Sequence, residues 1–216
     1  MAGVSHKIPV TSWRATSTWG LRPRMVAPLV GGLCLVGVGE GLLVASNLGA
    51  TPWTVFAQGL SRHLQVSVGW STALISLVVL FFWIPFRERP GLGTIANLVL
   101  IAASLNETAA LVTTPHSLVV RLILVLVGTE SIGFGSALYL TTALGPGPRD
   151  GLMTSIHRKC HISVVYVRSA IELTVLVLGI VLGGIFGIGT LLFAASIGLC
   201  IGLNLSLVAR FVGVAT

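Results

Sequence analysis

Six apolar stretches, each about as long as a transmembrane helix, limit what this chain can fold into more than any other feature. They cover residues 26–48, 66–86, 92–112, 118–143, 162–183 and 185–209. A helix needs about 20 residues to cross the ~30 Å hydrocarbon core of a bilayer. Charged residues make up only 9% of the chain, against about 25% of an ordinary soluble domain. The sequence therefore predicts an all-α integral membrane protein with six transmembrane helices.

Basic residues predict which side of the membrane the termini occupy. With six spans both termini lie on one side, and ten of the 13 Lys and Arg residues then fall on that side. Because cytoplasmic loops are enriched in Lys and Arg, we expect both termini to be cytoplasmic, with residues 1–25 as a disordered basic tail. The net charge of +7 then reflects topology and contact with anionic lipid. We expect the lipid bilayer as a partner and no nucleic acid.

The chain matches itself at a spacing of 96 residues. The matching landmarks are Gly49 and Gly145, Pro52 and Pro148, and the two runs Gly91-x-Gly93-Thr94 and Gly187-x-Gly189-Thr190. They define two repeats of three spans each, at residues 26–112 and 118–210. An odd number of spans makes the two repeats point in opposite directions, which is the inverted topology common in secondary transporters. A duplication that only built a stable bundle would leave the same pattern.

A polar segment follows the first span of each repeat, at residues 49–64 and 145–161. Each segment is too short and too polar to cross the bilayer. Pro52 and Pro148 suit the first position of a helix, and Thr51 could cap the earlier one. We expect a short helix in each segment, either re-entrant, with an N-terminus that favours anions, or lying at the membrane interface.

Several motifs resemble those of a known bacterial family. They are Gly147-Pro148-Arg149-Asp150-Gly151-Leu152-Met153, Arg168-x-x-x-Glu172-Leu173 and Gly183-Gly184-x-x-Gly187-Ile188-Gly189-Thr190, with Leu48-Gly49-x-x-Pro52-Trp53 in the first half. Over residues 26–210 the chain is similar to the YczE-like branch of the YczE/YyaS/YitT membrane proteins. The resemblance implies a multi-pass protein of the bacterial plasma (inner) membrane, with export or support of secondary-metabolite synthesis as its role. Thr54 departs from the family pattern, in which an aspartate follows the tryptophan.

Four ionisable residues inside the predicted spans are the main candidates for a binding site. Glu130 and Glu172 fall close to the midpoints of their spans, and Glu40 lies a few residues to the outer side. Such a residue costs at least about 2.5–3.5 kcal/mol at a helix centre, so we predict that these acids bind a proton or substrate. Arg168 is predicted to hold an acidic group of the substrate. The alternatives are an ion pair between Arg168 and Glu172, four residues apart, and neutral acids bonded to a neighbouring helix.

Arg149 and Asp150 are predicted to form a gate at the cytoplasmic mouth. The alternative is that they are an acid at a helix N-terminus and an ordinary cytoplasmic basic residue. His157, Cys160 and His161 share a helical face but lack a fourth ligand, so we expect no metal site. The sequence has no nucleotide-binding or hydrolase motif, so we expect no cofactor and no enzyme activity.

Together these features predict a proton-coupled exporter of a small organic molecule. The alternative is a non-transporting membrane protein that docks or supports biosynthetic enzymes through a cytoplasmic surface that includes Arg87, Arg89, Arg158 and Lys159. Gly179 and Gly183 could serve either packing within the chain or a homodimer.

Overall fold

The apolar stretches fold into six long helices, and a short helix follows the first span of each half. The computed structural model describes residues 8–212. In chain order the helices are α1 (Pro23–Ser46), α2 (Pro52–Leu64), α3 (Val68–Phe81), the 3-10 helix η1 (Ile84–Phe86), α4 (Leu92–Leu111), α5 (Leu118–Thr141), α6 (Pro148–Cys160), α7 (Val164–Val181) and α8 (Ile188–Val212). Six segments, with α3 and η1 counted as one, are long and apolar enough to cross a membrane, and residues 8–212 contain no strand. Over the described residues, the prediction of an all-α protein with six helices that could cross a membrane is confirmed.

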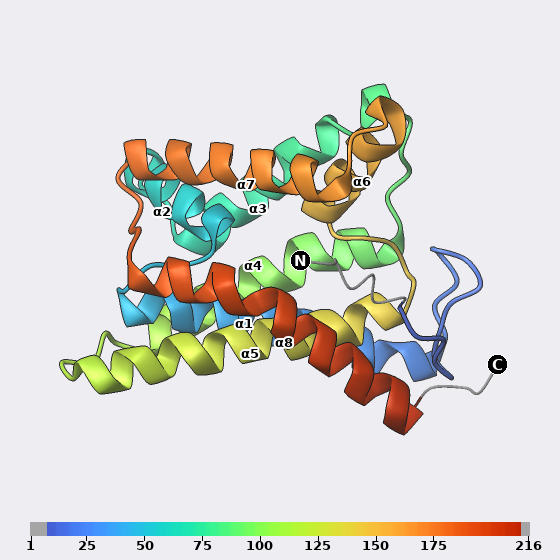
Figure 1. Ribbon diagram of the computed structural model, residues 1–216, viewed down its shortest axis with the longest axis horizontal. Helices are drawn as coiled ribbons and strands as arrows, with labels where there is room; N and C mark the ends of the chain where they lie inside the picture. The colour runs from blue at the N-terminus through green and yellow to red at the C-terminus, as the bar shows by residue number, and fades with distance from the viewer. Residues whose placement is uncertain (1–7, 213–216) are drawn as a thin grey trace.

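The helices lie in two layers (Figure 1). In the lower layer α1 packs against α4 and α5, and α5 packs against α8. In the upper layer both short helices, α2 and α6, pack against α3 and α7. α3 also packs along α4 and so joins the two layers. Within the described residues, α7 and α8 do not pack against each other in the way that α3 and α4 do. The layers are therefore held together along one edge and separate along the other.

Two pairs of glycines let α1 and α5 cross in close contact. A Cβ atom at Gly32 would lie 2.7 Å from the carbonyl oxygen of Gly135, and one at Gly128 would lie 2.8 Å from that of Gly39. Larger residues would force the two backbones apart. Because the glycine order on α5 is the reverse of that on α1, the two helices run antiparallel. Small residues at a helix crossing are common in membrane proteins, where backbone proximity improves van der Waals packing.

Gly179 on α7 also serves packing within the chain. A Cβ atom there would lie 2.6 Å from the backbone nitrogen of Phe56 on α2. The helix face that carries Gly179 is therefore occupied by α2.

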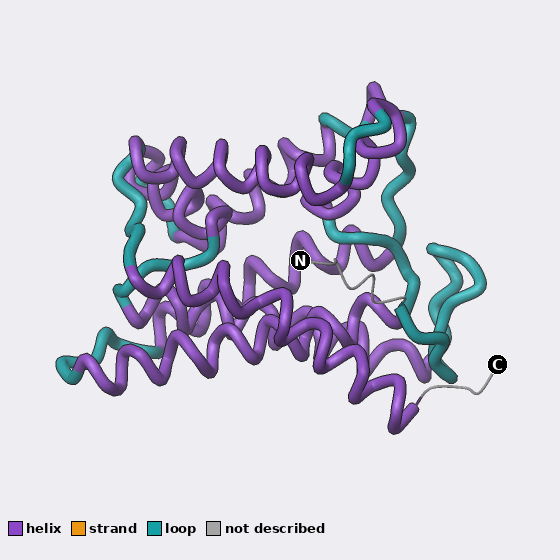
Figure 2. The backbone as a smooth tube through the Cα atoms, viewed as in Figure 1, coloured by secondary structure: helices purple, strands orange, loops and turns teal. Residues whose placement is uncertain are grey.

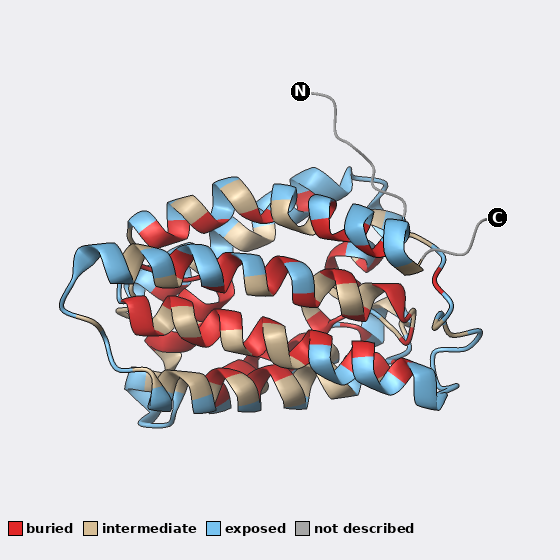
Figure 3. Ribbon diagram, turned by 90° about the horizontal axis from the view of Figure 1, so that it is seen from below, coloured by how far each residue is buried: buried red, intermediate tan, exposed pale blue. Residues whose placement is uncertain are grey.

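The outward faces of the helices are exposed, and the buried residues line the interior (Figure 3). Leu111, Val181 and Phe211 are among the most exposed large hydrophobic residues. Polar side chains such as Thr54 and Thr94 are instead fully buried. A lipid bilayer accommodates an apolar outer surface of this extent, which water does not.

Two loops at opposite ends of the bundle make the same contact with the two halves exchanged (Figure 2). The N–H of Gly189 donates to the carbonyl of Leu48 at 2.8 Å, and the N–H of Gly93 donates to the carbonyl of Leu144 at 2.9 Å. Each donor and each acceptor lies 96 residues from its counterpart. The first loop of each half is thus completed by the last helix of the other.

The glycines that follow these carbonyls need their conformational freedom. Gly49 and Gly145 have φ angles of +110° and +118°, a region that other residues rarely adopt. Cβ atoms at the two positions would lie 2.5 Å from Oγ1 of Thr190 and 2.9 Å from Oγ1 of Thr94, respectively. Both the backbone conformation and the close approach of the facing threonine therefore require glycine.

Arg121 holds the end of α1. Its Nε donates to the carbonyl of Ser46 and its Nη2 donates to the carbonyl of Asn47, both at 2.6 Å. These carbonyls end a helix and lack intrahelical partners, and a cation is favourable there. We expect Arg121→Met to destabilise the fold by about 1–2 kcal/mol, measured as a lower melting temperature in detergent. Arg121→Lys keeps the charge but not the two-pronged donor geometry and should fall between, whereas equal melting temperatures for all three proteins would contradict this role.

Part of the N-terminal tail packs against the bundle, although the sequence predicts disorder for it. The hydroxyl of Thr11 donates to the carbonyl of Thr141 at 3.2 Å, and the indole N–H of Trp13 donates to the hydroxyl of Thr141 at 3.1 Å. The N–H of Ala15 donates to the carbonyl of Thr142 at 2.8 Å. Residues 1–7 of the predicted tail lie outside the described residues.

Candidate functional site

A cavity of about 260 Å³ lies between the layers and is lined by residues from all eight α-helices. Five charged side chains face it: Glu40, Arg149, Asp150, Arg168 and Glu172. Most of the remaining wall is apolar or aromatic. The cavity therefore gathers charged groups from α1, α6 and α7 that are far apart in the sequence.

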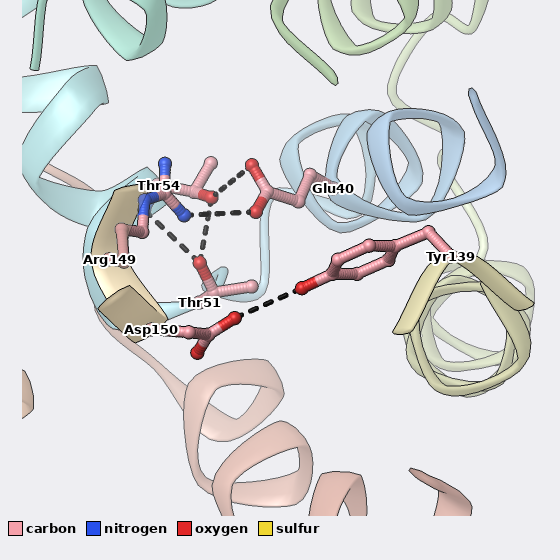
Figure 4. A network of polar contacts seen from close by, with 6 residues as sticks. All are labelled: Glu40, Thr51, Thr54, Tyr139, Arg149 and Asp150. Atoms are coloured by element: carbon pink, nitrogen blue, oxygen red, sulfur yellow. Dashed lines mark hydrogen bonds and ion pairs between the residues drawn. The ribbon is translucent and has the colours of Figure 1, made fainter. Parts of the chain in front are cut away.

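Glu40 is the most deeply buried of these charges, with 4% of its surface exposed. Its Oε2 accepts a hydrogen bond of 3.1 Å from the hydroxyl of Thr54, and its Oε1 lies 3.3 Å from Nη1 of Arg149 (Figure 4). The Arg149 guanidinium also lies 5.0 Å from the ring centroid of Trp53, which is within cation–π distance. The carboxylate of α1 is thus held by one group from each short helix.

The short helices bring their N-terminal turns to this cavity. Thr51 caps α2, as the sequence predicts, and its hydroxyl accepts from the N–H of Thr54 at 3.2 Å. α6 begins at Pro148, whose carbonyl accepts a hydrogen bond of 2.9 Å from the indole N–H of Trp83. Both helices are buried at their starts and exposed at their C-terminal ends. They are therefore inserted into the bundle by their first turns and do not lie on its surface along their whole length.

Asp150 occupies the first turn of α6 and faces the cavity without a cationic partner. The hydroxyl of Tyr139 donates to its Oδ2 at 3.0 Å (Figure 4). Within residues 8–212, no Lys, Arg or His nitrogen forms an ion pair with this carboxylate at 4.0 Å or less. The carboxylate of Asp150 is thus hydrogen-bonded to the neutral phenol of Tyr139 on α5.

Arg168 and Glu172 form an ion pair on α7, as their spacing predicts. Nε of Arg168 lies 2.8 Å from Oε1 of Glu172. The two side chains are 47% and 32% exposed. They therefore mark the mouth of the cavity, on the edge where α7 and α8 do not pack together.

Glu130 is the one predicted acid that the structure does not bring to the cavity. It lies on an exposed face of α5, where its Oε1 accepts a hydrogen bond of 2.6 Å from the amide of Asn204 on α8. Glu40, Arg168 and Glu172 do meet there, and Arg149 and Asp150, predicted as a gate, join them. The predicted binding residues thus fall in two separate places.

Several uncharged polar groups of the cavity were not singled out by sequence reasoning. Thr72 is only 2% exposed, and its hydroxyl has no hydrogen-bond partner within the described chain. Ser76, one helical turn further along α3, also lines the cavity, together with Asn97 and Tyr139. Two hydroxyl residues four apart in an apolar helix are a weak signal, because such groups also bond to their own backbone.

Across residues 8–212 the structure holds no cluster of three or more His, Cys, Asp or Glu side chains suited to a metal ion. The cavity is instead built from ion pairs, hydroxyls, one amide and aromatic rings. Such a lining can offer hydrogen bonds and both signs of charge to a small molecule.

Comparison with known proteins gives relatives over nearly the whole chain. A family described as "Family of unknown function (DUF6198)" matches residues 24–205. An "Uncharacterized protein" of Haemophilus influenzae is 46% identical over 203 residues, which cover 94% of this chain and 93% of the relative. The "Uncharacterized membrane protein YczE" of Bacillus subtilis is 33% identical over 176 residues, which cover 81% of this chain and 82% of the relative. The "Uncharacterized protein YyaS" of the same organism is 28% identical over 183 residues, which cover 83% of this chain and 91% of the relative. No solved structure matches this chain.

Proposed function

The chain belongs to the DUF6198 family, in the YczE-like branch of these membrane proteins, and we propose that it is a proton-coupled secondary transporter. In this proposal it resides in the bacterial plasma membrane with both termini in the cytoplasm and exports a small organic molecule. The substrate occupies the cavity between the two layers.

The buried pair of Glu40 and Arg149 is the observation that carries the proposal. The two residues come from different halves of the chain, and their side chains are only 5% and 19% exposed. Burying a charge pair costs several kcal/mol per ion, and an apolar pair of similar volume would stabilise a bundle equally well or better. Ionisable residues retained at membrane depth beside a cavity are therefore best explained by a role in binding or proton transfer.

The proposal includes alternating access between two inverted repeats, at residues 26–112 and 118–210. The exchanged hydrogen bonds of Leu48 with Gly189 and of Leu144 with Gly93 support a two-fold relation between them. In the repeat, α7 and α8 are the counterparts of α3 and α4. The structure, in which α3 packs on α4 but α7 does not pack on α8, then represents one of two equivalent states. In the other state α7 closes on α8, and α3 separates from α4, so that the cavity opens elsewhere.

The alternative, enzyme docking through basic residues, gains no support from the contacts of Arg158 and Lys159, whereas Arg87 and Arg89 are exposed. Arg158 pairs with Glu88, and Nζ of Lys159 donates to the carbonyl of Pro85 at 3.2 Å. Both side chains thus attach α6 to the loop after α3. Docking of biosynthetic enzymes is the alternative function if the transport test described below gives a negative result.

The proposal predicts that a solute will drive proton movement across a membrane that contains this chain. The full-length protein is reconstituted into vesicles that enclose a pH-sensitive dye, and organic cations, anions, zwitterions and neutral molecules are added outside. We expect one class to change the lumen pH in protein-containing vesicles and not in empty ones. Glu40→Gln should slow this change at least tenfold, because the neutral amide leaves the charge of Arg149 unpaired in the wall of the cavity.

Glu107→Gln is the matched control, because Glu107 is an exposed carboxylate on α4 away from the cavity. It should transport at the rate of the unaltered chain. If no solute class moves protons, and no labelled solute exchanges between the two sides, the transport proposal is wrong.

A further inference from the structure

We infer that the cavity binds a monovalent organic cation in exchange for one proton, with Asp150 as the group that both occupy. The inference rests on the proposed transport function and adds the class of substrate and the stoichiometry. It follows from the balance of charges around the cavity and from the hydroxyl of Thr72, which lacks a partner within the described residues.

The charged groups of the cavity do not balance. α1 contributes Glu40, α6 contributes Arg149 and Asp150, and α7 contributes Arg168 and Glu172, while the lining residues of the other helices include no charged side chain. Two arginines therefore face three carboxylates, and each arginine already pairs with one of them. Asp150 is left with the neutral hydroxyl of Tyr139, the other titratable group that lines the cavity.

A carboxylate without an ion-pair partner is unfavourable in a cavity between membrane-spanning helices, because the low dielectric there strengthens its field and water solvates this half-buried residue only in part. One positive charge restores the balance. A proton on Asp150 provides that charge, and so does a bound monovalent cation. Either the proton or the cation is enough to neutralise the cavity, and both together would leave it with a net positive charge. The proton and the cation therefore compete for Asp150.

The other walls of the cavity suit the body of an organic molecule. Thr72 lines the cavity, and its buried hydroxyl has no hydrogen-bond partner within the described residues. Tyr139 presents an aromatic ring, which attracts cations, whereas the ring of Trp53 already lies against Arg149. Phe193 and Ile197 on α8 supply apolar surface. A small ammonium compound with an apolar group would satisfy each of these features.

An anion fits the same cavity less well. The N-terminal turns of α2 and α6 favour negative charge, but Arg149 lies 3.3 Å from Glu40 and Arg168 lies 2.8 Å from Glu172. An anion would have to displace one of these carboxylates from its arginine. A cation displaces only the proton of Asp150, so one cation crosses for each proton and no net charge moves.

The test uses three probes that share an aromatic ring and differ in charge: benzyltrimethylammonium, benzenesulfonate and benzyl alcohol. Each is added outside vesicles that contain the full chain and a pH-sensitive dye, with the membrane potential clamped by potassium and valinomycin. We expect benzyltrimethylammonium alone to raise the lumen pH, because protons leave as the cation enters. The initial rate should be the same at every clamped potential.

Asp150→Asn should lower that rate at least tenfold, and Glu107→Gln should leave it unchanged. Asp150→Glu keeps the carboxylate and should retain part of the rate, so it replaces Asp150→Asn as the test if that variant does not fold. Tyr139→Phe removes the hydrogen bond to Asp150 without a change of charge and should keep one-for-one exchange.

The outcomes separate the inference from the function on which it rests. If benzenesulfonate or benzyl alcohol moves protons and the cation does not, the chain is a transporter but the inferred substrate class is wrong. Cation exchange that persists unchanged in Asp150→Asn, or whose rate follows the membrane potential, also overturns the inference. If neither these probes nor the wider panel of solutes produces proton movement or exchange, the transport function itself is contradicted.

Discussion

Gly32→Ala is expected to destabilise the fold by about 3 kcal/mol, the upper end of the usual cost of overpacking. The added Cβ would lie 2.7 Å from the carbonyl oxygen of Gly135 and 2.9 Å from the backbone nitrogen of Tyr139. Both are backbone atoms of α5, which cannot move aside as a flexible side chain can. The two helices must therefore separate, which also displaces Tyr139 from Asp150. Thermal unfolding of the purified protein in mild detergent measures the effect as a lower melting temperature.

Gly31→Ala is the matched control on the same helix. A Cβ atom at Gly31 would meet no other atom within 4 Å. The substitution should be neutral or stabilise the protein, because alanine favours a helix over glycine by about 1 kcal/mol. A similar loss of stability in both variants would contradict the role assigned to Gly32 at the crossing of α1 and α5, because helix propensity alone favours alanine at both positions.

Glu40→Ala is expected to be still more disruptive, at about 3–5 kcal/mol, because it removes one partner of a buried ion pair. Arg149 would remain 3.3 Å from the vacated carboxylate position with only 19% of its side chain exposed. The hydroxyl of Thr54 would also lose its acceptor. The melting temperature in detergent should fall clearly below that of Glu88→Ala. That control breaks the exposed pair with Arg158, and such pairs contribute at most about 1 kcal/mol.

The double variant Glu40→Leu with Arg149→Met separates stability from function. Replacing both charges by apolar groups removes the uncompensated arginine, so we expect the melting temperature to recover by several degrees over Glu40→Ala. Transport should not recover, because the charges themselves serve transport in the proposed mechanism. A double variant that transports normally would contradict the role assigned to the pair.

Much of the fold could be predicted from local features of the sequence. Apolar length alone located the six spans, and the Thr51-Pro52 and Gly147-Pro148 sequences located the starts of α2 and α6. These features act within a few residues, so no tertiary contact is needed to recognise them. Their positions in the structure agree closely with the predicted segments.

The pairing of the charges could not be predicted in the same way. Position along a span gives the depth of a residue but not the direction in which its side chain points, and these helices are apolar on nearly every face. Glu40 and Glu130 therefore looked alike, yet one faces the cavity and the other faces outward. The partnership of Glu40 with Arg149 depends on how deeply α6 inserts its first turn into the bundle, which is a tertiary property.

Thr54 illustrates how a departure from a family pattern acquires a physical meaning. An aspartate at this position would place a second carboxylate within hydrogen-bonding distance of Glu40. The threonine instead donates a hydrogen bond to Glu40 at 3.1 Å. In this chain the position therefore stabilises the carboxylate of α1 and does not compete with it for Arg149.

The exchanged contacts between the halves also determine when the protein can complete its folding during synthesis. The carbonyl of Leu48 emerges early from the ribosome, but its donor, the N–H of Gly189, is made 141 residues later. The donor Gly93 likewise precedes its acceptor Leu144. The first three spans must therefore enter the membrane and persist there with an unfinished loop while most of the second half is translated. Insertion of the first spans therefore precedes completion of this loop, so that the first half reaches its final structure only after α8 has been made.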